Sequence, residues 1–262
     1  MLAVLITGAT SGIGYELAKI FAENKFNLFL VSRNEIKLNL IKSDFERNSG
    51  IKVTVLAKDL SLPQSPKEVY QFANDNNIDI EILVNNSGFG HWGNFFETDI
   101  EKENRMLNLN INALTLMTKY FLPNMVKTKK GKIMNVASVA GFFPGPFMSV
   151  YYATKSYVIS FSEAIREELK GSGITVTTLC PGPTVTGFEK NAELQDSNLF
   201  ALLKPASADK VARYGYRALM AGKGIVVYGV LNKCMVFMRR FVPNFLILKI
   251  LKKVQGRIKE KS

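Results

Sequence analysis

Near its N-terminus the chain reads Thr7-Gly8-Ala9-Thr10-Ser11-Gly12-Ile13-Gly14, directly after an apolar run and directly before a helical pattern that begins at Tyr15. Glycine lets a turn tighten and lets backbone N–H groups approach a ligand closely. The N-terminus of the following helix favours anions, so strand, turn and helix together predict a pyrophosphate site. A glycine turn that binds no ligand is the alternative interpretation of this stretch alone.

The rest of the chain alternates apolar runs with helical patterns, which indicates a parallel sheet wrapped by helices. The runs are near-continuous in Val, Ile and Leu, as in strands covered on both faces. We expect a doubly wound α/β sheet of the Rossmann type with about seven strands. The expected strands are 2–7, 27–31, 52–57, 81–85, 132–137, 175–180 and 224–228, and the expected helices are 13–24, 34–48, 66–76, 101–127, 152–170 and 207–221.

Composition is ordinary for a soluble globular protein, with 47% hydrophobic and 21% charged residues among 262. No linker or repeat divides the chain, so we predict one catalytic domain at residues 1–229 and a C-terminal extension at residues 230–262. The N-terminal apolar run has no basic segment before it and no small-residue cleavage site after it. It therefore predicts a buried strand rather than a signal peptide.

The two cysteines and the one histidine argue against a metal site. Cys180 and Cys234 lie far apart without the spacing of metal ligands, and reduced thiols in a cytosolic setting are expected. His91 lies in a glycine-flanked loop, where we expect a partly exposed residue without a chemical role. A titratable contact is the alternative for this histidine.

One helical pattern carries two groups that can move a proton. Tyr151 and Lys155 stand at positions i and i+4 and share a helix face. A phenol titrates near ~10, and a neighbouring ammonium favours the phenolate, so we expect a lowered pKa at Tyr151. Tyr151 would then act as a general acid or base. Tyr152 has no lysine four residues on, and we assign it to packing.

These features resemble the single-domain branch of the short-chain dehydrogenase/reductase family. The resemblance rests on Gly-x3-Gly-x-Gly at residues 8–14, on Asn85-Asn86-Ser87-Gly88, and on Tyr-x3-Lys at residues 151–155, and it spans roughly residues 2–225. In the second motif Ser87 replaces the family's alanine. The resemblance implies a nicotinamide cofactor and the catalytic residues Asn110, Ser138, Tyr151 and Lys155.

The family assigns a role to each catalytic residue. The resemblance implies that Ser138 hydrogen-bonds the substrate oxygen and that Lys155 binds the nicotinamide ribose and starts a proton relay. Asn110 matches the asparagine that orders a water for this relay. Asn112 is a rival for that position, but the family's spacing favours Asn110.

The expected cofactor is NADP(H) rather than NAD(H). The second strand ends at Ser32-Arg33, without the acid that selects NAD. Arg33 can bind a 2′-phosphate and Ser32 can add a hydroxyl, whereas nearby Glu35 leaves NAD open. The expected cofactor-binding residues are Gly8, Thr10, Ser11, Gly12, Ile13, Gly14, Ser32, Arg33, Asp59, Leu60, Asn86, Gly88, Tyr151, Lys155, Pro181, Gly182, Thr184 and Thr186.

Aromatic and apolar residues follow both Ser138 and Pro181-Gly182, and in the family these segments line the substrate site. They predict an apolar substrate, such as a fatty or steroid-like ketone. Packing in the core or at a subunit interface is the alternative. The expected substrate contacts are Ser138, Phe142, Phe147 and Phe188, with Leu194, Leu199 and Phe200 further along the same wall.

The C-terminal tail carries most of the chain's net charge of +12, because residues 231–262 contain nine basic residues and one acid. Apolar residues are interspersed with the basic ones, and Pro243 divides the tail into two expected helices. Such amphipathic helices suit an anionic membrane surface, or they cover the domain or a subunit partner. Nucleic acid binding is not expected, because the basic excess is confined to the tail.

The sequence thus predicts an NADP(H)-dependent oxidoreductase that transfers a hydride between nicotinamide and an apolar carbonyl or alcohol substrate. We expect a cytoplasmic protein that is membrane-associated if the tail binds lipid. The resemblance implies a homodimer or tetramer. A catalytically idle cofactor-sensing or scaffold protein on the same fold is the alternative.

Overall fold

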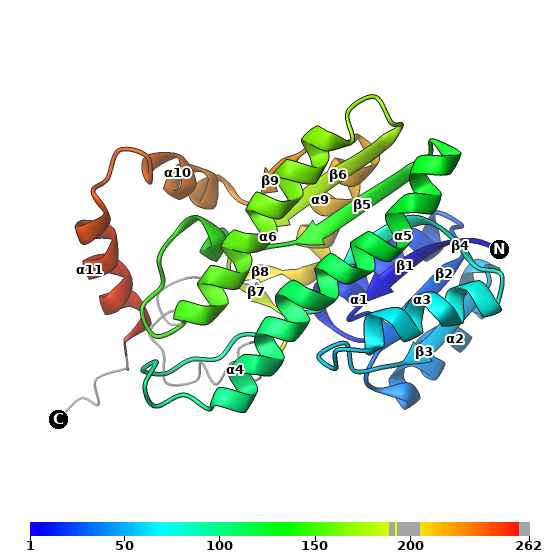
Figure 1. The fold of residues 1–262 in the computed structure, drawn as a ribbon, viewed down its shortest axis with the longest axis horizontal. Coiled ribbons are helices and arrows are strands. Elements are labelled where there is room, and N and C mark those ends of the chain that lie inside the picture. Colours follow the sequence, from blue (N-terminus) through cyan, green and yellow to red (C-terminus); the bar gives the residue numbers. More distant parts are fainter. Residues whose placement is uncertain (189–191, 193–204, 257–262) are drawn as a thin grey trace.

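A computed structural model describes residues 1–188, 192 and 205–256 of the chain. Seven parallel strands form one twisted sheet in the order β3-β2-β1-β4-β5-β6-β9, which confirms the predicted doubly wound fold (Figure 1). The strands are β1 (Leu2–Thr7), β2 (Leu28–Ser32), β3 (Val53–Ala57), β4 (Asp79–Asn85), β5 (Gly131–Val136), β6 (Ile174–Cys180) and β9 (Ile225–Val227).

The strand order reverses between β1 and β4, which are neighbouring parallel strands. In such sheets the crevice beyond the carboxyl ends of these two strands is where ligands bind. The glycine turn follows β1 and the Asn85-Asn86-Ser87-Gly88 segment follows β4. Both motifs therefore meet at this crevice.

Helices cover both faces of the sheet. One layer packs α1, α2 and α9 around Leu17, Leu38 and Val211, and the other packs α3, α5 and α6 around Val69 and Met117. The helices are α1 (Gly12–Glu23), α2 (Glu35–Ser49), α3 (Ser65–Asp75), α4 (Ile100–Leu107), α5 (Leu114–Thr128), α6 (Ser149–Glu168) and α9 (Ala208–Met220).

One predicted helix is more complex than its pattern. The expected helix at 101–127 consists of α4 and α5 joined by a π-helical segment, Asn108–Ala113. Such i→i+5 turns are rare and occur mostly at functional sites. Two further features were not predicted, a short strand pair β7 (Thr184–Val185) with β8 (Ala206–Ser207), and a 3-10 turn at Val139–Phe142.

The tail forms two helices, α10 (Val230–Met238) and α11 (Asn244–Gln255), and Pro243 precedes the second as predicted. α10 begins three residues after β9, so both helices lie beyond the carboxyl ends of the strands (Figure 1). No helix within the described ranges is long and apolar enough to cross a bilayer.

Candidate active site

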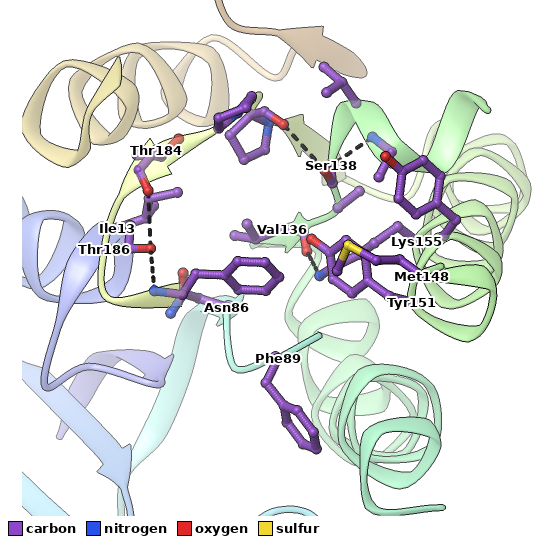
Figure 2. Close-up of a pocket in the computed structure, with 18 of the residues that line it drawn as sticks. Ile13, Asn86, Phe89, Val136, Ser138, Met148, Tyr151, Lys155, Thr184 and Thr186 are labelled. Carbon is purple, nitrogen blue, oxygen red and sulfur yellow. Dashed lines mark hydrogen bonds between the residues drawn. The ribbon is translucent and has the colours of Figure 1, made fainter. Parts of the chain in front are cut away.

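A cavity with a volume of about 1030 Å³ lies at the carboxyl end of the sheet. Pockets for one drug-sized ligand measure about 300–1,000 Å³. Figure 2 shows Ile13, Thr184 and Thr186 on one side of this space, and Tyr151 and Lys155 on the other. The helices α10 and α11 supply a third wall.

The glycine turn forms the floor of the cavity. Gly8 and Gly12 have φ angles of 67° and 54°, a conformation that suits glycine. Gly14 has a different role, because a Cβ there would collide with the carbonyl oxygen of Gly8 and the side chain of Asn86. Ser11, the N-cap of α1, makes no side-chain hydrogen bond to the first turn. The N-terminus of α1 therefore faces the cavity uncapped by a side chain.

A hydrogen-bond network joins this turn to the end of β4. Asn86 donates from Nδ2 to the carbonyl oxygen of Thr7 at 2.9 Å, and the Thr7 hydroxyl accepts from the backbone N–H groups of Asn86 and Ser87 at 3.0 Å each. Sequence reasoning missed Thr7 as part of the site. Its position as the last residue of β1, before the first glycine, is the signal that identifies it.

The predicted cofactor residues converge on the cavity with one exception. Gly14 does not line it, since this glycine packs the helix against the turn instead. The predicted residues that line the cavity are Gly8, Thr10, Ser11, Gly12, Ile13, Ser32, Arg33, Asp59, Leu60, Asn86, Gly88, Tyr151, Lys155, Pro181, Gly182, Thr184 and Thr186.

At the far end of the cavity, basic side chains surround Asp59. Arg105 bridges Asp59 at 2.7 Å, whereas Arg33 makes no ion pair among the described residues. Partial burial acts to raise the pKa of Asp59, but hydrogen bonds from Ser61 and the charge of Arg105 hold it below the usual value. The hydroxyl groups of Thr10 and Ser32 lie 2.8 Å apart beside Arg33. Arg33 and these hydroxyls are thus available to an anion.

Three predicted catalytic side chains meet on the opposite wall. Ser138 ends the segment after β5, and Tyr151 and Lys155 project from the first turns of α6 (Figure 2). All three side chains are buried and line the cavity. Lys155 donates from Nζ to the carbonyl oxygen of Val136 at 2.9 Å, and this nitrogen lies 5.8 Å from the centroid of the Tyr151 ring.

Burial governs the titration of this pair. It raises the pKa of Tyr151 to about 12, although a hydrogen bond with Ser138 acts in the opposite direction. Burial also lowers the pKa of Lys155 to about 8. The expectation that the neighbouring ammonium lowers the pKa of Tyr151 is therefore wrong, because burial raises that pKa instead. The free energy needed to remove the phenolate from water is larger than the stabilisation that the nearby groups give it.

Asn110 lies in the π-helical segment, and its side chain hydrogen-bonds two neighbouring segments. Its side chain accepts a hydrogen bond from the Phe89 N–H at 3.2 Å and donates to the Phe89 carbonyl at 2.9 Å and to Thr154 at 3.0 Å. A Cβ at Gly88 would lie 3.0 Å from Asn110 Oδ1 and 3.4 Å from Lys155 Nζ. Asn110, Gly88 and Lys155 therefore lie close together. Asn112 instead bonds Asn108 on the exposed side.

Only some of the residues predicted for the substrate wall line the cavity. Phe188 lines the cavity and packs against Tyr151, with ring centroids 5.2 Å apart. Phe142 does not line it, because the 3-10 turn places this ring against a separate core beside Val158 and Cys180. Phe147 does not line the cavity either; it has a φ of 64° and packs against Trp92. Phe143 and Met148 line the cavity in their place. The predicted residues Leu194, Leu199 and Phe200 lie outside the described residues.

The tail supplies cavity residues that sequence reasoning did not assign. Gln255 at the end of α11 donates from its side chain to the Tyr152 hydroxyl, and its carbonyl accepts from Trp92 Nε1 at 2.8 Å. Burial raises the pKa of Tyr152, which lines the cavity. Apolar spacing of i, i+3, i+4 and i+7 within 247–254 is the signal for this inward face. The tail residues that line the cavity are Asn232, Met235, Met238, Arg239, Val242, Ile247, Ile250, Leu251 and Val254.

His91 is buried, with 8% of its surface exposed, which corrects the expectation of a partly exposed residue. Among the residues whose placement is described, no group of three His, Cys, Asp or Glu side chains could hold a metal ion.

The residues fit a dinucleotide. An uncapped helix N-terminus with two left-handed glycines suits a pyrophosphate, and the guanidinium of Arg33, which lines the cavity, suits a further phosphate. The catalytic side chains line the same cavity, across from the glycine turn.

Comparison with known proteins agrees with this arrangement. A family model described as short chain dehydrogenase matches residues 2–197. The very-long-chain 3-oxoacyl-CoA reductase of Laccaria bicolor is 35% identical over 179 residues, which cover 67% of this chain and 52% of that protein. That of Macaca fascicularis is 32% identical, covering 71% and 60%. This chain thus matches little more than half the length of these two relatives.

Two further relatives match over almost all of this chain. The dehydrogenase/reductase SDR family member 7B of Xenopus laevis is 29% identical, covering 99% of this chain and 84% of that protein. The solved structure of a short-chain dehydrogenase from Sphingobium yanoikuyae in complex with NADPH is 27% identical, with a TM-score of 0.82, covering 100% and 99%. The chain therefore belongs to the short-chain dehydrogenase/reductase family of oxidoreductases, whose members bind a nicotinamide cofactor.

Proposed function

We propose that the chain is an NADP(H)-dependent reductase that converts a ketone on a long apolar chain, such as a 3-oxoacyl thioester, into the secondary alcohol. One observation carries this proposal: Ser138, Tyr151 and Lys155 form the middle of a cavity that has Arg33 and the glycine turn at one end and an apolar wall at the other. The tail helices complete that wall.

The catalytic side chains suit reduction. When bound, nicotinamide supplies the hydride that reaches the carbonyl carbon. Tyr151 donates its proton to the carbonyl oxygen, which Ser138 holds by a hydrogen bond. Because burial raises the pKa of Tyr151 to about 12, the phenol keeps its proton at neutral pH and is ready to donate it. Lys155 positions the reacting groups beside Asn110 and resupplies the proton.

Arg33 supports the preference for NADP(H). Its guanidinium lines the cavity at the carboxyl end of β2, and it forms no ion pair within the described parts of the chain. A fork of N–H donors matches the geometry of a phosphate. The Sphingobium yanoikuyae relative was solved with NADPH, which agrees with this preference.

The apolar wall supports a long-chain substrate. Phe143, Met148 and Phe188 lie near Tyr151, and Leu251 and Val254 of α11 extend the apolar lining away from it. Two of the relatives are called very-long-chain 3-oxoacyl-CoA reductases. A ketone close to one end of an acyl chain would place the carbonyl at Tyr151 and the chain along the tail helices.

The test is NADPH oxidation with 3-oxoacyl thioesters of increasing chain length. We expect kcat/KM to rise with chain length and NADPH to be preferred over NADH. Tyr151→Phe should lower kcat by about 10²- to 10⁴-fold while NADPH binding persists. Tyr157→Phe is the matched control, since this exposed phenol of the same helix bonds Thr115 outside the cavity. Equal turnover of all chain lengths, or full activity of Tyr151→Phe, would refute the proposal.

A further inference from the structure

Much of the exposed surface of α10 is apolar. Leu231, Cys234, Met238 and Phe241 follow at i, i+3, i+7 and i+10, so they share one helix face that continues through the turn after α10. Phe237 flanks this stripe, with its ring centroid 5.4 Å from that of Phe241. We call the exposed residues of this stripe the tail face: Val230, Leu231, Cys234, Phe237, Met238 and Phe241.

Basic side chains border the tail face. Lys233 of α10 and Arg240 in the turn after it are exposed beside the stripe, and Lys249, Lys252 and Lys253 are exposed on α11. Residues 230–256 contain no Asp or Glu. An apolar surface with a purely basic border matches the chemistry of the interface of an anionic bilayer, where rings enter the acyl layer and ammonium groups meet the headgroups.

The charge also argues against a second copy of this chain on the tail face. A two-fold symmetric interface brings identical surfaces together. It would therefore set two purely basic borders against each other at short range, where like charges repel. An anionic surface reverses the sign of that interaction.

The tail face is continuous with the cavity. Met238 and Ile250 each line the cavity, yet they remain 50% and 58% exposed. They belong to different helices, one to α10 and the other to α11, and so mark a place where the apolar lining reaches the surface. The inward faces of both helices, including Met235 and Leu251, extend this lining towards Tyr151. The apolar lining of the cavity thus reaches the tail face.

We infer that α10 and α11 dock on an anionic lipid bilayer through the tail face, and that the cavity receives its apolar substrate there. The docking stands on the surface chemistry alone. The delivery of substrate rests on the proposed function. Arg239 and Gln255, which bond Phe142 and Tyr152 inside the molecule, hold the two helices in the orientation that docking requires.

The experiment uses the natural Cys234, which is exposed within the tail face, whereas Cys180 is buried. A solvatochromic dye on Cys234 of the full chain reports its surroundings without any substitution. Vesicles of phosphatidylcholine with phosphatidylglycerol are compared with vesicles of phosphatidylcholine alone. We expect a blue shift and co-sedimentation with the anionic vesicles, both weakened by high salt.

A pair of matched variants tests which surface binds. Phe237→Ser with Phe241→Ser removes two rings that are 57% and 67% exposed, and should weaken vesicle binding at least about tenfold. The control, Ile36→Ser with Leu40→Ser on α2, removes side chains that are 76% and 66% exposed, and should change binding less than about twofold. Equal binding of both variants and the unchanged chain overturns the docking surface.

Other outcomes decide against the inference in distinct ways. In the absence of vesicles, the blue shift could grow with protein concentration while an oligomer sediments. If the Phe237 and Phe241 variant does not form that oligomer, the tail face is a subunit interface and the inference is wrong. Vesicle binding without any NADPH oxidation leaves docking intact and refutes the proposed function. Turnover of long-chain substrate that anionic vesicles do not stimulate refutes delivery from the bilayer.

Discussion

The two ends of the cavity are built in different ways. At the cofactor end, the glycine turn and the Asn86-Ser87-Gly88 segment follow β1 and β4, which are neighbours in the sheet, and hydrogen bonds between Asn86 and Thr7 join them. At the substrate end, the walls depend on single side-chain contacts between distant segments. Trp92 bonds Gln255 across 163 residues, and Arg239 bonds Phe142 across 97. The first end is fixed by the fold, and the second can vary while the fold persists.

The largest expected effect comes from breaking the cofactor end at Gly14. In the interior of a helix, alanine is favoured over glycine by about 1 kcal/mol. Here the added Cβ meets the Gly8 carbonyl and the Asn86 side chain, so we expect Gly14→Ala to destabilise the protein by about 3 kcal/mol and to weaken NADPH binding more than tenfold. Urea unfolding and NADPH titration measure both effects. A stabilised Gly14→Ala variant would contradict the close packing.

The same contrast explains what the sequence could predict. Strand runs, the glycine turn and the Tyr151–Lys155 spacing depend on local periodicity, which is visible in one sequence. The place of Phe142 was predicted wrongly, because its ring direction depends on a 3-10 turn and on the bond from Arg239. The π-helical segment around Asn110 has no sequence pattern of its own, and the apolar periodicity of 101–127 continues through it.

The second prediction concerns the catalytic wall between the two ends. Burial lowers the pKa of Lys155 to about 8 from 10.5, so the folded protein binds fewer protons than the unfolded chain between these values. Stability therefore rises with pH across this window, and charging Lys155 costs stability below it. Lys155→Met removes this cost.

At pH 7 we expect Lys155→Met to be more stable by about 2 kcal/mol, because about 1 kcal/mol is lost with the hydrogen bond to Val136. The gain should shrink as the pH rises from about 8 to 10.5. Urea unfolding at several pH values without cofactor provides the measurement. A gain that does not depend on pH would show that the ammonium is not the source of the cost.

The third prediction tests whether Arg33 recognises the 2′-phosphate independently of the glycine turn, which binds the pyrophosphate in our proposal. Arg33→Ser removes the guanidinium but leaves the glycine turn unchanged, so NADPH affinity should fall about tenfold or more and NADH affinity should change less than about twofold. Lys37→Ser, a nearby exposed cation that does not line the cavity, is the control. Equal loss of both dinucleotides would assign Arg33 to structure rather than to the 2′-phosphate.

The smallest expected effect comes from removing one hydrogen bond at the substrate end and leaving the cofactor end unchanged. Tyr152→Phe removes the acceptor for the buried Gln255 side chain, so α11 should hold the wall less firmly. We expect KM for long-chain substrates to rise about fivefold, equivalent to about 1 kcal/mol, with kcat and NADPH affinity little changed. Adding Gln255→Met should restore most of the loss, because replacing both partners leaves no unsatisfied group. If kcat falls instead and the double variant recovers nothing, the Tyr152 hydroxyl acts on the substrate itself, and the two ends of the cavity are less independent than their construction indicates.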